Sequence, residues 1–203
     1  MQAGEFYYWG PLLYRNRISQ EFVNELLQRG NASNIDFRPN LAGILEKESE
    51  YTIQDKEFFA KEIGPIMADY ANAYMHYYGA DALQNKLFQL EDLWINYMYP
   101  GDYNPLHVHT DTLSFVIYLQ IPENLRQEYE DWKKVSDKGS GPGAIHFLYG
   151  QMQDQFINAR YFMPEVGDIF IFPAGLYHTV GPFKSEGTRI SVAGNYRIVE
   201  MNS

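Results

Sequence analysis

The stretch YPGDYNPLHVHTDTLSFVIYL (99–119) places three metal-binding side chains directly before a run of apolar and β-branched residues. Residues two apart in an extended strand project from the same face, so His107, His109 and Asp111 can present two imidazoles and a carboxylate along one edge. Such side chains suit iron and related transition metals. A His-x-His pair alone is a weak indication of a metal site, so its meaning depends on the rest of the chain.

A second stretch, about 70 residues further on, completes the pattern. GDIFIFP (167–173) reads as a strand, His178 follows it, and Arg189 and Ser191 share one face of the next predicted strand. Two adjacent ligands and a distant His form a facial set that leaves coordination positions open. The planar guanidinium of Arg189 suits a carboxylate. The layout predicts a mononuclear non-haem iron site beside an anchor for an anionic cosubstrate.

These two stretches resemble the core of the iron(II)- and 2-oxoglutarate-dependent dioxygenases, in particular bacterial and phage oxygenases that are similar in outline to prolyl hydroxylases. The shared outline is Tyr-x-x-Gly-x-Tyr, His-x-Asp, a strand, Gly-Asp-(apolar)-Phe-Pro, His and Arg-x-Ser. It covers 94–198, about half of the chain. The resemblance implies a double-stranded β-helix (jelly roll) with Fe²⁺ at one mouth of the barrel. It also implies substrate hydroxylation by dioxygen, coupled to oxidative decarboxylation of 2-oxoglutarate to succinate and CO₂.

Two ligand sets fit the pattern. If the chain is aligned to the family outline by its Tyr-Gly turn, the ligands are His107, His109 and His178, and more residues support this alignment. If it is aligned by the His-x-Asp pair, Asp111 replaces His107 in the ligand set. In the first alignment, Asp111 is instead a partner that orients a ligand imidazole. Three His ligands leave the full charge on Fe²⁺, whereas a carboxylate would reduce it. Since ligand imidazoles must be neutral, we expect metal affinity to fall below about pH 6.5.

Three residues are predicted to bind the cosubstrate. The resemblance implies that Arg189 binds the distal carboxylate of 2-oxoglutarate and that Ser191 adds a hydroxyl donor. Tyr118, in the strand after the ligand turn, is a third candidate for the same carboxylate. Asn96 and Asn195 are weaker candidates for polar groups of the pocket.

The length of 203 residues predicts one domain, 1–203, of the α+β class and mainly β. Its N-terminal segment, 1–83, is expected to hold helices that pack on one sheet. Ser19 is a predicted N-cap for a helix that ends near Gly30, and a longer helix over 55–78 contains Gly64-Pro65, which can kink or split it.

The remaining segment, 84–203, is the predicted jelly-roll core. It contains an inserted polar segment, 122–142, that we interpret as a loop with one helical turn. The expected strands are β-branched or aromatic runs bounded by turn residues, at 93–98, 113–121, 144–148, 168–172 and 189–198.

Composition excludes several classes of function. Acidic residues outnumber basic ones by 26 to 16 and the net charge is -10, which argues against bulk electrostatic binding of nucleic acid. The absence of Cys excludes disulfides and thiolate metal sites. No apolar run approaches the ~20 residues of a membrane span, and no secretory signal pattern is present. We expect a cytoplasmic protein that acts on a small-molecule, peptide or protein substrate; the oligomeric state is not indicated.

Two other functions fit the same residues. One is a catalytically degenerate jelly-roll binding protein, because the carboxylate ligand is in doubt. The other is a cupin-like metal dioxygenase with three His ligands that does not use 2-oxoglutarate.

Overall fold

Two antiparallel sheets face each other in the computed structural model, which describes residues 4–8, 10–136, 139–150 and 159–201. The larger sheet has eight strands, in the order β1 (Glu5–Tyr8), β2 (Leu12–Arg17), β10 (Asp168–Pro173), β7 (Leu113–Gln120), β12 (Arg189–Glu200), β5 (Lys86–Met98), β4 (Lys47–Glu50) and β3 (Ile35–Asp36). The smaller sheet has four, in the order β6 (Asn104–His107), β11 (Tyr177–Val180), β8 (Ile145–Leu148) and β9 (Ala159–Phe162).

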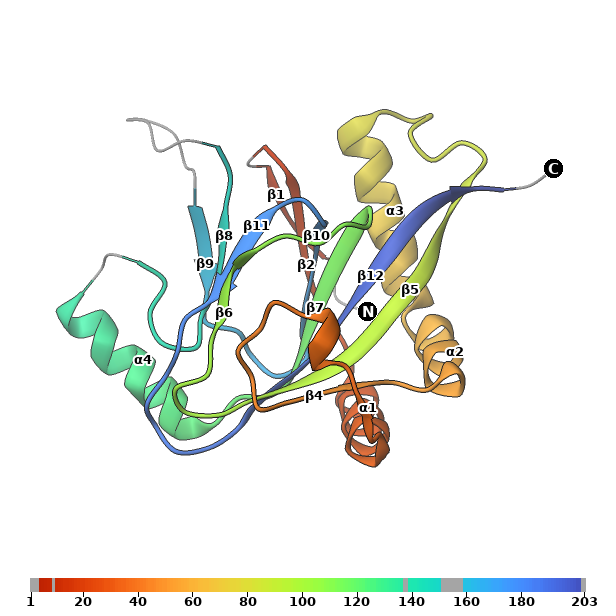
Figure 1. Ribbon diagram of the computed structural model, residues 1–203. Helices are drawn as coiled ribbons and strands as arrows, with labels where there is room; N and C mark the ends of the chain where they lie inside the picture. The colour runs from red at the N-terminus through yellow and green to blue at the C-terminus, as the bar shows by residue number, and fades with distance from the viewer. Residues whose placement is uncertain (1–3, 9, 137–138, 151–158, 202–203) are drawn as a thin grey trace.

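The helices lie on both sides of this pair of sheets (Figure 1). Three of them, α1 (Gln20–Ala32), α2 (Ile53–Glu62) and α3 (Gly64–Tyr78), cover the outer face of the larger sheet. The fourth, α4 (Glu123–Val135), lies on the other side, near the smaller sheet. None of these helices is both long and apolar enough to cross a membrane. The predicted α+β class, with N-terminal helices packed on one sheet, is confirmed.

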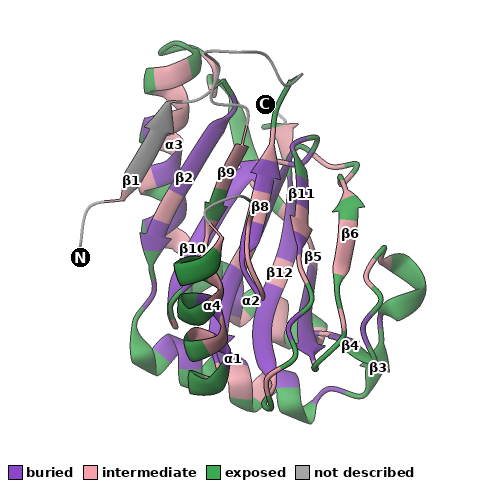
Figure 2. Cartoon of the chain, turned by 90° about the vertical axis from the view of Figure 1, so that its left-hand side faces the viewer, coloured by how far each residue is buried: buried purple, intermediate pink, exposed green. Residues whose placement is uncertain are grey.

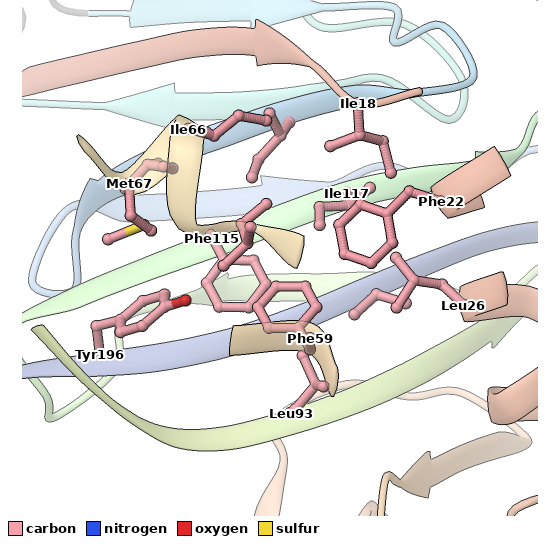
Figure 3. Close-up of a cluster of buried hydrophobic side chains, with 14 of the residues drawn as sticks. Ile18, Phe22, Leu26, Phe59, Ile66, Met67, Leu93, Phe115, Ile117 and Tyr196 are labelled. Carbon is pink, nitrogen blue, oxygen red and sulfur yellow. The ribbon is translucent and has the colours of Figure 1, made fainter. Parts of the chain in front are cut away.

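Successive side chains along the strands of the larger sheet point to opposite faces and so contribute to two hydrophobic cores. In β7, Phe115 and Ile117 point toward the helices and join the first core, where Phe115 stacks on Phe59 of α2 with ring centroids 5.2 Å apart (Figure 3). Tyr118, the residue after Ile117, points toward the smaller sheet and joins the second core with Phe147 of β8. Strands that are covered on both faces are buried along most of their length. Figure 2 shows this burial as purple along β2, β10 and β12.

The same alternation determines where the functional candidates of β12 lie. Ile190 and Val192 belong to the core under the helices, so Arg189 and Ser191 project into the space between the sheets. Both are buried although they are polar. The predicted strand therefore carries Arg189 and Ser191, the predicted anchor residues, into the interior of the sandwich.

The helix predictions are confirmed in part. The Ser19 side chain accepts a hydrogen bond from the Phe22 backbone N–H, and the second predicted helix is divided at Gly64-Pro65 into α2 and α3. The predicted C-terminal role of Gly30 is wrong, because α1 continues to Ala32. Gly30 instead lets the helix approach Ile95, whose Cδ1 would lie 2.5 Å from an added Cβ.

The interpretation of 122–142 as a loop with one helical turn is wrong. The segment contains α4, thirteen residues long, which buries Leu125 and Tyr129. Trp132, one turn further on, has its ring centroid 5.7 Å from that of Tyr129. These three apolar residues at spacings of four and three form a narrow stripe, and the charged residues around them belong to the exposed face.

We expect Gly194→Ala to lower the free energy of unfolding by about 1–3 kcal/mol, measured by urea denaturation. An added Cβ at this position of β12 would lie 2.4 Å from the backbone oxygen of Asp92 and 2.5 Å from the ring of Phe115. Neither group can move without separating β12 from its neighbours. Gly64→Ala is the control, since nothing lies within 4 Å of its added Cβ. Equal stability of Gly194→Ala and the wild type would contradict the packing described here.

Candidate active site

Three imidazoles, one from β6, one from the segment after it and one from β11, meet between the sheets. His107 ends β6, His109 follows two residues later, and His178 on β11 is the register partner of His107. Their ligand nitrogens all lie within 4.8 Å of one another, and the ring centroids of His107 and His178 are 4.2 Å apart. Within the described residues this is the only group of three or more His, Cys, Asp or Glu side chains with that spacing.

Backbone carbonyls orient two of the imidazoles. The Nδ1 atom of His107 lies 2.7 Å from the Pro105 carbonyl oxygen, and that of His178 lies 2.9 Å from the Leu176 carbonyl oxygen. A carbonyl oxygen can only accept, so Nδ1 carries the hydrogen in both rings. The Nε2 lone pair of each ring is then free to bind a metal ion.

Burial keeps all three imidazoles neutral. Burial and, to a lesser extent, the charge that His107 would carry lower the pKa of His178 to about 3 and that of His109 to about 4. The pKa of His107 is lowered mainly by its own burial. Neutral imidazole is the form that binds metals, so the expected loss of metal affinity moves from about pH 6.5 to a lower pH.

In the metal-free protein, His178 is expected to make stability depend on pH. Its folded-state pKa lies below the unfolded value of about 6.5, so the unfolded chain takes up the proton first as the pH falls. The wild type should lose about 2 kcal/mol between pH 7 and pH 5 from this residue, and His178→Gln should lack that part of the decrease. Urea unfolding of both proteins at the two pH values measures the difference; parallel pH dependences would contradict the burial of a neutral imidazole.

Asp111 lies outside the three-His group. Its Oδ1 accepts a hydrogen bond from Arg197 Nη2 at 3.0 Å, which gives the carboxylate a cationic partner of its own. Of the two ligand sets that the sequence allows, the structure brings together the nitrogens of His107, His109 and His178.

Within the described part of the chain, Arg189 is a buried cation without an anionic partner. It is 2% exposed, and its Nε and Nη2 atoms have no hydrogen-bond partner among the described residues. Its contacts include Met98 Sδ, 3.8 Å from Nη1, and the Tyr118 ring, whose centroid is 4.8 Å from the guanidinium carbon. Burial lowers the pKa of Arg189 because the charged form is deprived of water. Such a group is costly unless an anion pairs with it.

One pocket of about 180 Å³ contains both the imidazoles and the predicted anchor. Its lining includes the three His residues together with Arg189, Ser191 and Tyr118. The Tyr118 hydroxyl has no hydrogen-bond partner within the described part of the chain, and burial raises the pKa of Tyr118 to about 12. The three His residues, Arg189, Ser191 and Tyr118 therefore share one cavity, whereas Asp111 lines an adjoining hollow.

The two asparagines differ in position. Asn96 lines the same pocket, and its Nδ2 lies 3.4 Å from Ser191 Oγ. Asn195 lines an adjoining hollow, where it binds Ser114 and Asp92 through its side-chain amide.

Several residues of the pocket are absent from the sequence-based prediction. They are Trp94, Asn104, Glu48 and the residues 40–43 before β4. No local pattern indicates them, because they reach the pocket through strand pairing and through the chain segment that crosses in front of the larger sheet (Figure 1, orange).

A comparison with protein families gives one match over 92–195, just over half of the chain, to the family described as "Putative 2OG-Fe(II) oxygenase". The chain belongs to this 2OG-Fe(II) oxygenase family. The match spans β5 through most of β12 and so includes the three imidazoles, Arg189 and the pocket between the sheets. A search of curated proteins found no match.

Solved structures of similar fold include prolyl hydroxylases. A viral collagen prolyl hydroxylase from Paramecium bursaria chlorella virus 1, in complex with 2-oxoglutarate, has a TM-score of 0.57 at 16% identity over 92% of this chain and 96% of that chain. A Pseudomonas putida prolyl-4-hydroxylase has a TM-score of 0.56 at 13% identity over 91% of each chain. A Trichoplax adhaerens prolyl hydroxylase, in complex with a hypoxia-inducible-factor peptide fragment, has a TM-score of 0.55 at 12% identity over 94% of this chain and 84% of that chain. The predicted double-stranded β-helix is confirmed.

Proposed function

We propose that this member of the 2OG-Fe(II) oxygenase family hydroxylates its substrate with Fe²⁺, 2-oxoglutarate and dioxygen. The observation that supports this most strongly is the unpaired guanidinium of Arg189 in the same pocket as three neutral imidazoles. A buried cation next to a metal-binding group fits an anion that binds both at once, and 2-oxoglutarate has a carboxylate at each end.

In this proposal His107, His109 and His178 would hold Fe²⁺. When bound, Fe²⁺ and 2-oxoglutarate supply the oxidising chemistry, with release of succinate and CO₂ and transfer of oxygen to the substrate. The backbone carbonyls of Pro105 and Leu176 fix the tautomers of two ligand rings, so the nitrogens that face the ion need not lose a proton first.

The anchor residues bind and orient the cosubstrate. Arg189 pairs with the distal carboxylate, and charge-assisted hydrogen bonds of this kind contribute about 1.5–3 kcal/mol each when sheltered from water. The Tyr118 hydroxyl stays protonated at neutral pH and can donate to the same carboxylate. Ser191, the register partner of Tyr118, adds a second hydroxyl.

The proposal is tested by succinate formation from 2-oxoglutarate in air with added Fe²⁺, at high protein concentration because turnover without the substrate is slow. We expect succinate from the wild type and none above background from Arg189→Ala. Oxygen uptake that is indifferent to 2-oxoglutarate would favour a three-His dioxygenase of another kind. Absence of succinate together with retained 2-oxoglutarate binding would favour a binding protein.

A further inference from the structure

Glu48 is a buried carboxyl group in the active-site pocket that the proposed chemistry does not use. It lies on β4, is 3% exposed and lines the same pocket as the imidazoles. Its Oε2 atom has no hydrogen-bond partner among the residues that the structure describes. Burial raises its pKa to about 7, with Arg38 opposing the rise and Asp36 and Asp102 adding to it. A carboxyl group in this setting lacks the partner that burial normally requires.

Strand pairing places Glu48 away from the cosubstrate anchor. Glu48 on β4 pairs with Asn96 on β5, Asn96 pairs with Ser191 on β12, and Ser191 pairs with Tyr118 on β7. Neighbouring strands are about 4.8 Å apart, so the backbone of Glu48 lies roughly 10 Å from that of Ser191. A cosubstrate held by Arg189 and Ser191 therefore does not use Glu48, which is available to a different ligand.

Arg38 is the cation whose charge acts on Glu48, but its guanidinium donates to both carboxylate oxygens of Asp36. Asn96 directs its Nδ2 to Ser191 and accepts a hydrogen bond from Trp94 Nε1 at its Oδ1, 2.9 Å away. The Trp94 ring lines the same pocket, with its centroid 5.9 Å from that of His109. Trp94 thus contributes an aromatic ring to the pocket lining beside His109, and Phe37 packs against the same ring with centroids 5.4 Å apart.

The approach to this side of the pocket is acidic. An adjoining hollow shares Trp94 and His109 with the pocket and is lined by Asp92 and Asp111. Among the described residues that line the two hollows, Arg189 is the only Lys or Arg, and it lies at the cosubstrate end. Asp111 pairs with Arg197 and Asp92 accepts a hydrogen bond from Asn195. Glu48 is the carboxylate at this side whose Oε2 has no hydrogen-bond partner among the described residues, and it favours a positively charged ligand.

We propose that Glu48 binds a positively charged nitrogen of the substrate, an ammonium or guanidinium group such as that of a Lys or Arg side chain. This inference rests on the proposed function, because it assumes that the pocket is the place of reaction. The carboxylate gives the cation a charge-assisted hydrogen bond, and the face of Trp94 adds a cation–π contact. The substrate is then a basic amino acid, a basic peptide or another cationic amine.

The test is isothermal titration of the protein loaded with Fe²⁺ and 2-oxoglutarate under nitrogen. The probes are N-acetyl-lysine methylamide and its neutral counterpart N-acetyl-norleucine methylamide, with N-acetyl-glutamine methylamide as a neutral hydrogen-bond donor, each up to about 10 mM. We expect the wild type to bind the lysine probe at least about tenfold more tightly than either neutral probe. Glu48→Gln should lose this preference, and Glu46→Gln, an exposed glutamate of the same segment, should keep it.

Equal affinity of the wild type for the three probes, no measurable binding of the lysine probe, or a preference for the glutamine probe would each overturn the proposal without any variant. A preference that survives Glu48→Gln would overturn the role of this residue. The visible absorption band of Fe²⁺ with 2-oxoglutarate, recorded on the same samples, reports the metal site separately. A normal band without cation preference refutes the inference about Glu48 alone, whereas a missing wild-type band refutes the proposed function.

Discussion

Arg189→Met is expected to lower the affinity for 2-oxoglutarate by at least about a hundredfold. Two charge-assisted hydrogen bonds of about 1.5–3 kcal/mol each are lost, and each 1.4 kcal/mol corresponds to a factor of ten in affinity. Methionine fills a similar apolar volume, so the unliganded protein is not expected to lose stability. Removal of a buried, unpaired charge should leave its free energy of unfolding unchanged or raise it.

Titration calorimetry with the Fe²⁺-loaded protein under nitrogen measures the affinity, and urea denaturation measures the stability. Arg197→Met is the matched control, since Arg197 lies on the same strand, is exposed and pairs with Asp111. Arg189→Lys keeps the charge but not the planar fork and should recover only part of the affinity. Unchanged affinity in Arg189→Met, or a large loss of stability, would show that Arg189 has a structural role instead.

His107→Ala is expected to abolish stoichiometric Fe²⁺ binding, whereas Asp111→Asn is expected to retain it. Loss of a partner outside the ligand set typically costs 10- to 100-fold in metal affinity, so loss of one of three ligands should exceed about a hundredfold. Asp111 has its own cationic partner in Arg197 and lies outside the three-nitrogen group. Equilibrium dialysis against Fe²⁺ under nitrogen measures both variants.

His146→Ala serves as the control for removal of an imidazole. His146 is on β8, beside β11, but it does not belong to the three-His group. The opposite result, in which Asp111→Asn loses the metal and His107→Ala keeps it, would establish the His109, Asp111 and His178 set.

The parts of the fold that the sequence predicts are those whose pattern is local. The apolar run of β7 and the GDIFIFP strand are both continuous stretches covered on two faces, and Arg189-x-Ser191 follows from a period of two. The resemblance to the dioxygenases uses these same local stretches. For this reason the pocket of His178 and Arg189 could be anticipated from about half of the chain.

The missed features depend on contacts between distant segments. β4 has the sequence KESE, which carries no strand pattern, and it is a strand because it pairs with β5. Glu48 is therefore indistinguishable in the sequence from its acidic neighbours Glu46 and Glu50, which are less buried. Gly30 matches the local pattern of a helix end, but in the structure it serves the close packing of the helix against Ile95. The choice between the two ligand registers likewise needs the pairing of His107 with His178.

The central claim is that three imidazoles and one guanidinium bind Fe²⁺ and 2-oxoglutarate together in one pocket. It is tested most directly by anaerobic addition of Fe²⁺ and 2-oxoglutarate to the wild type, Arg189→Met and His178→Ala proteins, with visible absorption as the readout. We expect a weak charge-transfer band in the wild type, and its loss in both variants at 2-oxoglutarate concentrations that saturate the wild type. A wild-type protein without the band, or a band that persists in both variants, would contradict the claim.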